Sequence, residues 1–217
     1  MAEPRGQHLA LWLSGVALLG LCGWLGWQWW AGEDRSHAPI SWAALSPAEH
    51  VPLRLWDAIV IHHSNTRRDT TASIDTAHRK RGWDGVGYHF VIGNGRNMPE
   101  GQIDPTFRWI QQREGAHAGS SLLSKPFNEA GIGICLVGRF DEDKPGAYQE
   151  VRLAELCAVL IRHLPGLTPA SIIGHRNVPG KETACPGKHL DVERIRFLVR
   201  QRLEQPEVVV PDRLASR

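Results

Sequence analysis

A short β-branched run that ends in two histidines constrains this chain more than any other feature. Ala58-Ile59-Val60-Ile61 is apolar throughout, which is typical of a strand buried on both faces, and it places His62 at a rigid strand end. Far downstream, Gly174-His175-Arg176 and Cys185-Pro186-Gly187 add an imidazole and a thiol. Two imidazoles and one thiolate are three ligands of a tetrahedral Zn²⁺, so we predict a zinc site whose fourth position is open to water and therefore to chemistry.

The segment from residue 9 to residue 31 is predicted to cross a membrane. It contains no Asp, Glu, Lys or Arg. Its length matches the roughly 20 apolar residues that span a bilayer, and it exceeds the roughly 7–15 of a signal peptide. Its tryptophans cluster toward the far end, as expected of rings at the headgroup level. Arg5 precedes the segment whereas Glu33 and Asp34 follow it, which favours a single-pass inner-membrane protein with cytoplasmic residues 1–8 and its domain facing the periplasm and cell wall.

The rest of the chain is predicted to hold one domain between two polar segments. Residues 32–52 contain three prolines, which fits a short stem. Residues 53–203 have the length of an ordinary domain, and residues 204–217 read as a loosely held tail. A net charge of +2, with 22% charged residues, gives no sign of the concentrated basic face that nucleic-acid-binding proteins carry.

Helices and strands are predicted to alternate through the domain, which indicates an α/β fold. Asn94-Gly95 predicts a hairpin whose second strand runs from Arg96 toward Ile103. Asp191 is the predicted N-cap of the last helix. The expected strands span residues 58–61, 87–93, 132–138 and 172–173, and the expected helices span residues 73–81, 148–164 and 191–202.

Five motifs occur in the order seen in one protein family: IVIHHS, RGWDGVGYHFVI, GAHAG, N-x-x-GIGICLVG and GHRNVPGKETACPG. On these motifs the chain resembles the zinc-dependent N-acetylmuramoyl-L-alanine amidases of the peptidoglycan recognition protein and phage-lysozyme type, over about residues 57–199. The resemblance implies a mixed central β-sheet flanked by helices, with a groove for the glycan strand and stem peptide of peptidoglycan. It also implies hydrolysis of the amide that joins the lactyl group of N-acetylmuramic acid to L-alanine.

By this resemblance the zinc ligands are His62, His175 and Cys185. His63 is the nearest rival to His62, but successive strand residues point to opposite faces, so only one of the two can reach the metal. The family pattern selects His62 and leaves His63 beside the groove or behind the ligands. A purely structural zinc, closed by His89 or His189 as a fourth ligand, does not fit that pattern.

Two further residues match the family's catalytic positions. Tyr88 aligns with a tyrosine whose phenol can hydrogen-bond the developing oxyanion. Thr183 stands where phage members carry Lys and recognition proteins carry Thr, and a hydroxyl brings no positive charge. Lys181 is close in sequence, but the segment from His175 to Cys185 is longer than in either group, so the placement of Lys181 stays open. Glu182 is the least supported assistant.

The resemblance also implies substrate-binding residues. His117 is expected to contact substrate, because a groove needs few, well-placed polar groups. Arg176 could pair with a stem-peptide carboxylate or could simply face solvent. Asn128 has equal claims as a groove residue and as a brace, and Trp83 is expected to pack a helix against the sheet. The full predicted set is His63, His89, His117, Asn128 and Arg176.

The chain lacks one catalytic group that some related amidases carry. Some related cytoplasmic amidases place a glutamate base on the central strand, where this chain has Cys135. We interpret Cys135 as strand core, and we expect both Cys135 and Cys157 to be free thiols.

The alternative function is a membrane-anchored sensor that binds stem peptides without cutting them, but family members that only bind typically lack the ligand at Cys185.

Overall fold

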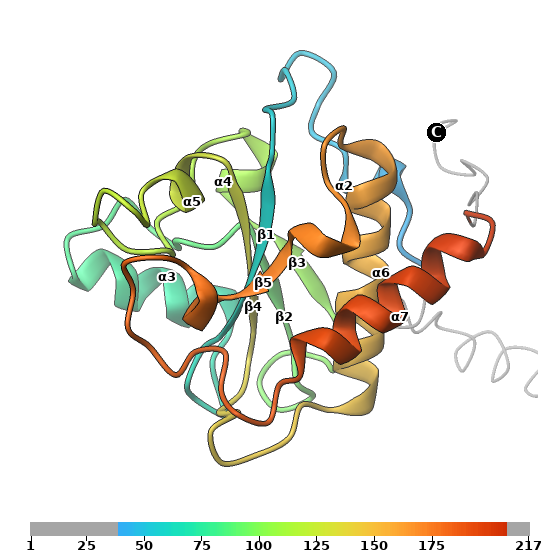
Figure 1. Ribbon diagram of the computed structural model, residues 1–217. Coiled ribbons are helices and arrows are strands. Elements are labelled where there is room, and N and C mark those ends of the chain that lie inside the picture. Colours follow the sequence, from blue (N-terminus) through green and yellow to red (C-terminus); the bar gives the residue numbers. More distant parts are fainter. Residues whose placement is uncertain (1–38, 208–217) are drawn as a thin grey trace, which may run out of the picture. The chain divides into compact units, whose positions relative to one another are not determined.

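The computed structural model describes residues 39–207. The predicted membrane segment over residues 9–31 lies outside this range, and no helix within residues 39–207 is long and apolar enough to span a bilayer. Five strands form one sheet in the order β3-β2-β4-β1-β5 (Figure 1). The strands are β1 (Ala58–His63), β2 (Phe90–Ile92), β3 (Ile103–Pro105), β4 (Gly131–Leu136) and β5 (Ile172–Gly174). The helices are α2 (Trp42–Leu45), α3 (Thr71–Lys80), α4 (Phe107–Ile110), α5 (Pro126–Glu129), α6 (Ala147–His163) and α7 (Val192–Glu204), with short 3-10 turns η2 (Pro169–Ser171) and η3 (His175–Asn177).

The sheet is mixed, as the resemblance implies. β1 runs parallel to both β4 and β5, β2 runs parallel to β4, and β3 is antiparallel to β2. Since parallel strands point the same way, the carboxyl ends of β1, β4 and β5 meet at one edge of the sheet, where ligands of open α/β sheets commonly bind.

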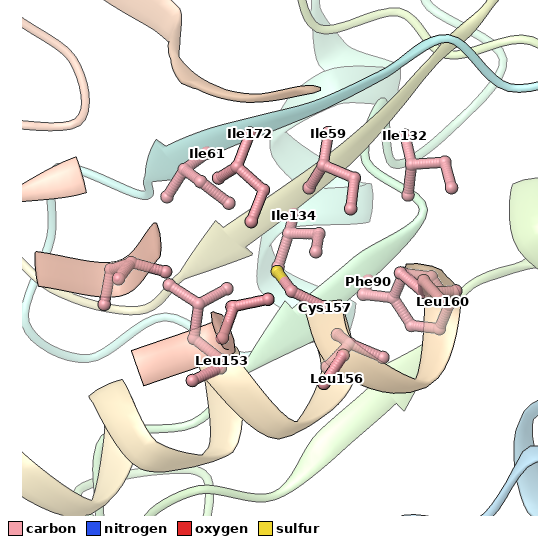
Figure 2. Packing of buried hydrophobic residues seen from close by; sticks show 14 of the residues in the cluster. Ile59, Ile61, Phe90, Ile132, Ile134, Leu153, Leu156, Cys157, Leu160 and Ile172 are labelled. Atoms are coloured by element: carbon pink, nitrogen blue, oxygen red, sulfur yellow. The ribbon is translucent and has the colours of Figure 1, made fainter. Parts of the chain in front are cut away.

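Side chains on the central strands alternate between two faces. Ile59 and Ile61 lie in the core cluster that includes residues of α6 and α7 (Figure 2). Val60 lies instead in a cluster on the opposite face. The period-2 pattern therefore sends His62 to the face of Val60 and His63 to the face of Ile61, as predicted.

Helix α6 fills the larger core because its apolar residues recur at helical spacing. Leu153, Leu156, Cys157 and Leu160 are fully buried against the isoleucines of the sheet (Figure 2). Each fully buried Leu side chain contributes about 1.5–3 kcal/mol relative to exposure. The prediction of a helix over residues 148–164 is confirmed to within about one residue at each end.

Helix termini follow local capping chemistry. The Asp191 carboxylate accepts hydrogen bonds from the backbone N–H groups of Glu193 and Arg194, so the predicted N-cap is confirmed. Helix α3 begins at Thr71 rather than at Ser73, because Thr70 and Ser73 form a capping box in front of it.

The hairpin differs from its prediction. β2 and β3 do pair antiparallel, but β3 begins at Ile103 and not near Arg96. Gly95 N–H donates to the Met98 carbonyl, so the chain turns on itself before it reaches the second strand. The strand predicted over residues 87–93 is confined to β2, since Gly87 donates its N–H to the His78 ring and not to a neighbouring strand.

The described part of the predicted stem contains α2, which packs against the domain. Its Ser41 N-cap accepts a hydrogen bond from Ala44 N–H. The Leu45 carbonyl accepts a hydrogen bond from Trp109 Nε1, and Trp42 stacks on His163 with ring centroids 4.6 Å apart. Residues before Leu53 thus contribute to the packed structure.

Candidate active site

Three predicted metal ligands come together at the carboxyl edge of the sheet. His62 lies near the end of β1, and His175 follows directly after β5, the parallel neighbour of β1. Cys185 lies in the loop between η3 and α7. Ligand atoms of the three residues all lie within 4.8 Å of one another, with Cys185 Sγ 3.7 Å from His62 Nδ1.

The loop that carries Cys185 is tied to the sheet by hydrogen bonds. Arg176 N–H donates to the Cys185 carbonyl over 2.7 Å, and the Arg176 guanidinium donates to the Gly187 carbonyl over 2.6 Å. Thr183 Oγ1 accepts from Cys185 N–H over 3.2 Å. Arg176 and Thr183 therefore act on the position of the thiol, and neither lines the groove described below.

The donor set fits zinc. His175 Nε2 is buried and has no hydrogen-bond partner among residues 39–207, while the backbone of Ala118 bonds the same ring. Leaving a buried polar atom unpaired costs about 1–3 kcal/mol, so such an atom calls for a partner. A metal ion held by His175 Nε2, His62 Nδ1 and Cys185 Sγ would supply it, and two imidazole nitrogens with one thiolate are ligands that zinc prefers.

Burial sets the protonation states of the cluster. Burial first, and then the neighbouring rings of His117 and His175, hold the pKa of His62 well below its usual value. Burial and then Lys181 lower the pKa of His175 to about 4. Both rings are therefore neutral near pH 7, as metal ligation requires. Burial raises the pKa of Cys185 to about 12, so its thiolate needs a cation beside it.

Tyr88 lies beside the cluster. Its ring centroid is 5.0 Å from that of His62, and it belongs to the groove wall. Burial first, and then the neighbouring Cys135 and Cys185, raise the pKa of Tyr88 well above its usual value. The side chain therefore stays a neutral phenol that can donate a hydrogen bond.

A groove of about 620 Å³ opens beside the cluster. His175, a candidate ligand, and Tyr88 both line it. Lys181 and Arg81 bring positive charge to its wall, and Asp84 brings negative charge. The lining residues are His78, Arg81, Trp83, Asp84, Tyr88, Ala116, His117, Gly119, Ser120, Asn128, His175 and Lys181.

Lys181, whose placement the sequence left open, lies in the groove wall together with the candidate ligand His175. It influences His175 electrostatically, and its Cδ lies 3.4 Å from the position that a Cβ on Gly119 would take. Thr183 and Glu182 are absent from the lining set. The positive charge that Thr183 cannot provide is thus brought to the groove by Lys181.

Besides Arg176, two predicted substrate contacts lie away from the groove. His63 is 7% exposed, and its Nδ1 accepts a hydrogen bond from Phe140 N–H over 3.2 Å. His89 is fully buried; its Nδ1 accepts from Gly133 N–H over 2.9 Å, and its Nε2 donates to the Arg113 carbonyl over 3.0 Å. Both nitrogens of His89 are used within the fold, so contact with substrate does not fit its placement.

His117 and Asn128 do line the groove, but their polar atoms are bonded within the protein. Asn128 Oδ1 accepts from the N–H groups of His117 and Ala118, each over 2.8 Å, and its amide donates to the Gly119 carbonyl. Asn128 thereby braces the loop that carries His117. The His117 ring bonds His62 and a backbone carbonyl.

The alternative ligands and the sulfur predictions have clear outcomes. Among the described residues, the cluster of candidate ligands contains no fourth member from His89 or His189. Cys135 and Cys157 are buried free thiols, as expected. Cys135 pairs in register with His62 across β4 and β1, so the central strand places a thiol, and not a carboxylate, behind the cluster.

Several groove residues, among them Arg81, Trp83 and Asp84, were not among the predicted site residues. Trp83 is 40% exposed and lies in the groove wall, and its ring centroid is 4.5 Å from that of His78 on α3. The Arg81-Gly82-Trp83 segment joins the end of α3 to the strand after Tyr88. Its position just before Tyr88, a predicted site residue, was the available signal.

Comparison with known proteins places this arrangement in a family. The family model described as N-acetylmuramoyl-L-alanine amidase matches residues 52–188, and the chain belongs to this family. The endolysin of Escherichia phage T7 is 27% identical over 162 residues, which cover 72% of this chain and 91% of the endolysin. A peptidoglycan-recognition protein of Drosophila simulans is 28% identical over 163 residues, covering 71% of this chain and 80% of that protein.

Solved structures agree with the fold. The N-acetylmuramoyl-L-alanine amidase LysC from Clostridium intestinale superposes with a TM-score of 0.56 at 27% identity, covering 69% of this chain and 91% of LysC. The mixed sheet with flanking helices is therefore the amidase fold, and the family expected from the sequence motifs is confirmed.

Proposed function

We propose that the chain is a zinc-dependent N-acetylmuramoyl-L-alanine amidase, which hydrolyses the amide between N-acetylmuramic acid and the L-alanine of peptidoglycan stem peptides. The observation that carries this proposal is the convergence of His62, His175 and Cys185 within 4.8 Å beside the groove, in a chain of the amidase family. The unpaired nitrogen of His175 adds independent support for a metal.

The metal would be held by His62, His175 and Cys185. When bound, Zn²⁺ supplies Lewis-acid chemistry that polarises a carbonyl and activates water near pH 7. Three protein ligands leave one coordination position open, which distinguishes a catalytic zinc site from a closed structural one.

The protein's own donors stabilise charge on the substrate. The Tyr88 phenol, protonated because of burial, donates a hydrogen bond to the lactyl carbonyl oxygen as negative charge develops there. The Lys181 ammonium lies on the groove wall near His175 and adds positive charge at the same end. Thr183 acts indirectly, since its hydroxyl holds Cys185 N–H.

The groove orients the substrate on either side of the scissile amide. Trp83 offers an exposed ring face, and Arg81 offers a cation that can pair with a carboxylate of the stem peptide. Asp84 provides an acceptor on the same wall. Peptidoglycan, with sugars, amides and carboxylates, matches this mixture of apolar and charged groups.

The proposed location is the outer face of the cytoplasmic membrane, with residues 9–31 as the anchor. Its support is the uncharged 23-residue sequence and the tryptophans at its end. Fractionation of cells that express the full chain, with and without residues 9–31, tests the anchor. Recovery of the full chain in the soluble fraction would contradict it.

Product analysis tests the activity. The purified full-length chain in detergent is incubated with peptidoglycan, with chelator, and with chelator followed by zinc, and products are identified by mass spectrometry. We expect free stem peptides beginning at L-alanine, lost on chelation and restored by zinc. A Cys185→Ala variant is expected to release none. Tight binding without cleavage would replace the proposal with the sensor function.

A further inference from the structure

We infer that His117 is a positioning residue for the metal site, because its ring fixes the tautomer and orientation of His62. The relay runs from His62 through His117 to the backbone carbonyl of Gly131. This inference rests on the proposed zinc site. It assigns to His117 a role different from the substrate contact that its sequence motif suggested.

The hydrogen bonds determine which nitrogen carries each proton. His117 Nε2 lies 3.1 Å from the Gly131 carbonyl oxygen, which can only accept, so Nε2 carries the hydrogen. A neutral imidazole has one N–H group, so His117 Nδ1 is an acceptor. His62 Nε2 lies 3.1 Å from that Nδ1 and must donate to it. His62 Nδ1 is therefore the unprotonated nitrogen.

The free nitrogen points to the metal cluster. His62 Nδ1 is the atom that lies 3.7 Å from Cys185 Sγ. With the opposite tautomer, a hydrogen on Nδ1 would occupy the ligand position, and two lone pairs would face each other between His62 and His117. The hydrogen bonds through His117 therefore leave His62 Nδ1 unprotonated and available as a metal ligand in the metal-free protein.

The surroundings of His117 are built to hold its ring in place. A Cβ added to Gly133 or to Gly115 would collide with His117 Cδ2, so both glycines allow the ring its position. Asn128 Oδ1 holds the His117 backbone N–H at 2.8 Å. The side of the ring is thus closely contacted, and both ring nitrogens have partners.

Residues that hydrogen-bond a metal-ligating histidine affect its orientation and its metal affinity. Ligating histidines usually donate their second ring N–H to a neighbouring acceptor, and loss of that acceptor typically weakens metal binding about 10–100-fold. In this chain the acceptor is itself a histidine, so its own tautomer must be fixed by a further contact. The Gly131 carbonyl provides that contact.

The test uses two amide replacements that differ in where the oxygen sits. In His117→Asn the side-chain oxygen can take the place of Nδ1 and accept from His62. In His117→Gln the amide reaches toward the Nε2 position and leaves His62 Nε2–H without its acceptor. His117→Leu removes both functions, and His78→Leu is the matched control, since both histidines are buried and His78 Nδ1 accepts from the Gly87 N–H rather than from a candidate ligand.

The readout is the zinc dissociation constant of each full-length protein, measured by competition with a chromogenic chelator. We expect His117→Gln and His117→Leu to bind zinc about 10–100-fold more weakly than wild type. We expect His117→Asn and His78→Leu to stay within about threefold of wild type, a range below typical losses of this kind. Substitution by Co²⁺ gives a second readout, because a displaced His62 changes the visible absorption of the tetrahedral ion.

The outcomes separate this inference from the proposed function. Equal zinc affinity for wild type, His117→Gln and His117→Leu would overturn the inference alone. If wild type and Cys185→Ala both fail to bind zinc, the proposed function falls and the inference falls with it. Circular dichroism in chelator selects folded variants, and the Asn and Gln pair keeps the test decisive if the Leu variant fails to fold.

Discussion

The ring of Tyr88 lies 5.0 Å from the ring of His62, centroid to centroid, and Tyr88 lines the groove whereas His62 is buried behind it. His62 comes from β1, whereas Tyr88 precedes β2, which is separated from β1 in the sheet by β4. The fold therefore brings the proposed donor beside the proposed ligand across an intervening strand.

Replacing Tyr88 with Phe tests its role as a donor. The ring and its packing are kept, but the hydrogen bond to the developing oxyanion is lost. We expect kcat to fall about 100–1,000-fold, the usual effect of removing one such donor. Zinc affinity is expected to stay unchanged, because the phenol is not a ligand. A loss of zinc with the loss of activity would assign Tyr88 to the metal site instead.

Comparison of Lys181→Met with Thr183→Val separates charge in the groove from support of the loop. A charge-assisted hydrogen bond is worth about 1.5–3 kcal/mol, so Lys181→Met is expected to lower kcat/KM about 10–150-fold at unchanged zinc affinity. Thr183→Val should weaken zinc binding and lower the thermal midpoint, since Cys185 N–H loses its acceptor. Steady-state kinetics and chelator competition measure the two effects, and the reverse pattern would contradict the assignment.

Arg176→Leu tests whether this arginine braces the loop or binds substrate. Its backbone bond to Cys185 remains, but the guanidinium bond to the Gly187 carbonyl is lost. We expect a lower thermal midpoint and about tenfold weaker zinc binding, similar to the loss of other groups that support ligands. A substrate contact would instead raise KM alone. Steady-state kinetics measure KM and a zinc titration measures metal affinity, both in phosphate-free buffer.

The metal-free protein is expected to lose stability in mild acid. Burial lowers the pKa of His175 to about 4 and that of His117 to about 3, and it also lowers the pKa of His62 and His89. Unfolded histidines protonate near pH 6.5, so the unfolded chain binds more protons below that pH. The free energy of unfolding should therefore fall as the pH drops from about 6.5 toward 4, by up to about 1.4 kcal/mol per pH unit for each histidine.

Urea denaturation in chelator, at several pH values between about 7.5 and 5, measures this effect. Most carboxylates titrate below this window, so the histidines dominate the slope. Zinc is expected to raise the free energy of unfolding and to steepen its fall with decreasing pH, because metal binding displaces the Cys185 proton from the folded state. A stability independent of pH across the window would contradict the neutral histidine cluster.

The sequence by itself determined the family, the candidate ligands and the main elements. Apolar periodicity identified β1, β4, α6 and α7, and period-2 alternation separated His62 from His63. The order of the motifs identified the family, and the residue types gave two imidazoles and one thiol as candidate ligands. These features are local, since each depends on spacing along a single segment.

Only the tertiary structure decided which partner each polar group takes. His89 and His117 look equivalent in the sequence, yet one bonds only backbone within the fold and the other bonds a proposed ligand. Arg176 turns to the Cys185 loop, and Lys181, not Thr183, reaches the groove. Hydrogen bonds are short and directional, so the partner of each group depends on which distant segments of the chain come into contact. Periodicity along the sequence does not predict these long-range contacts.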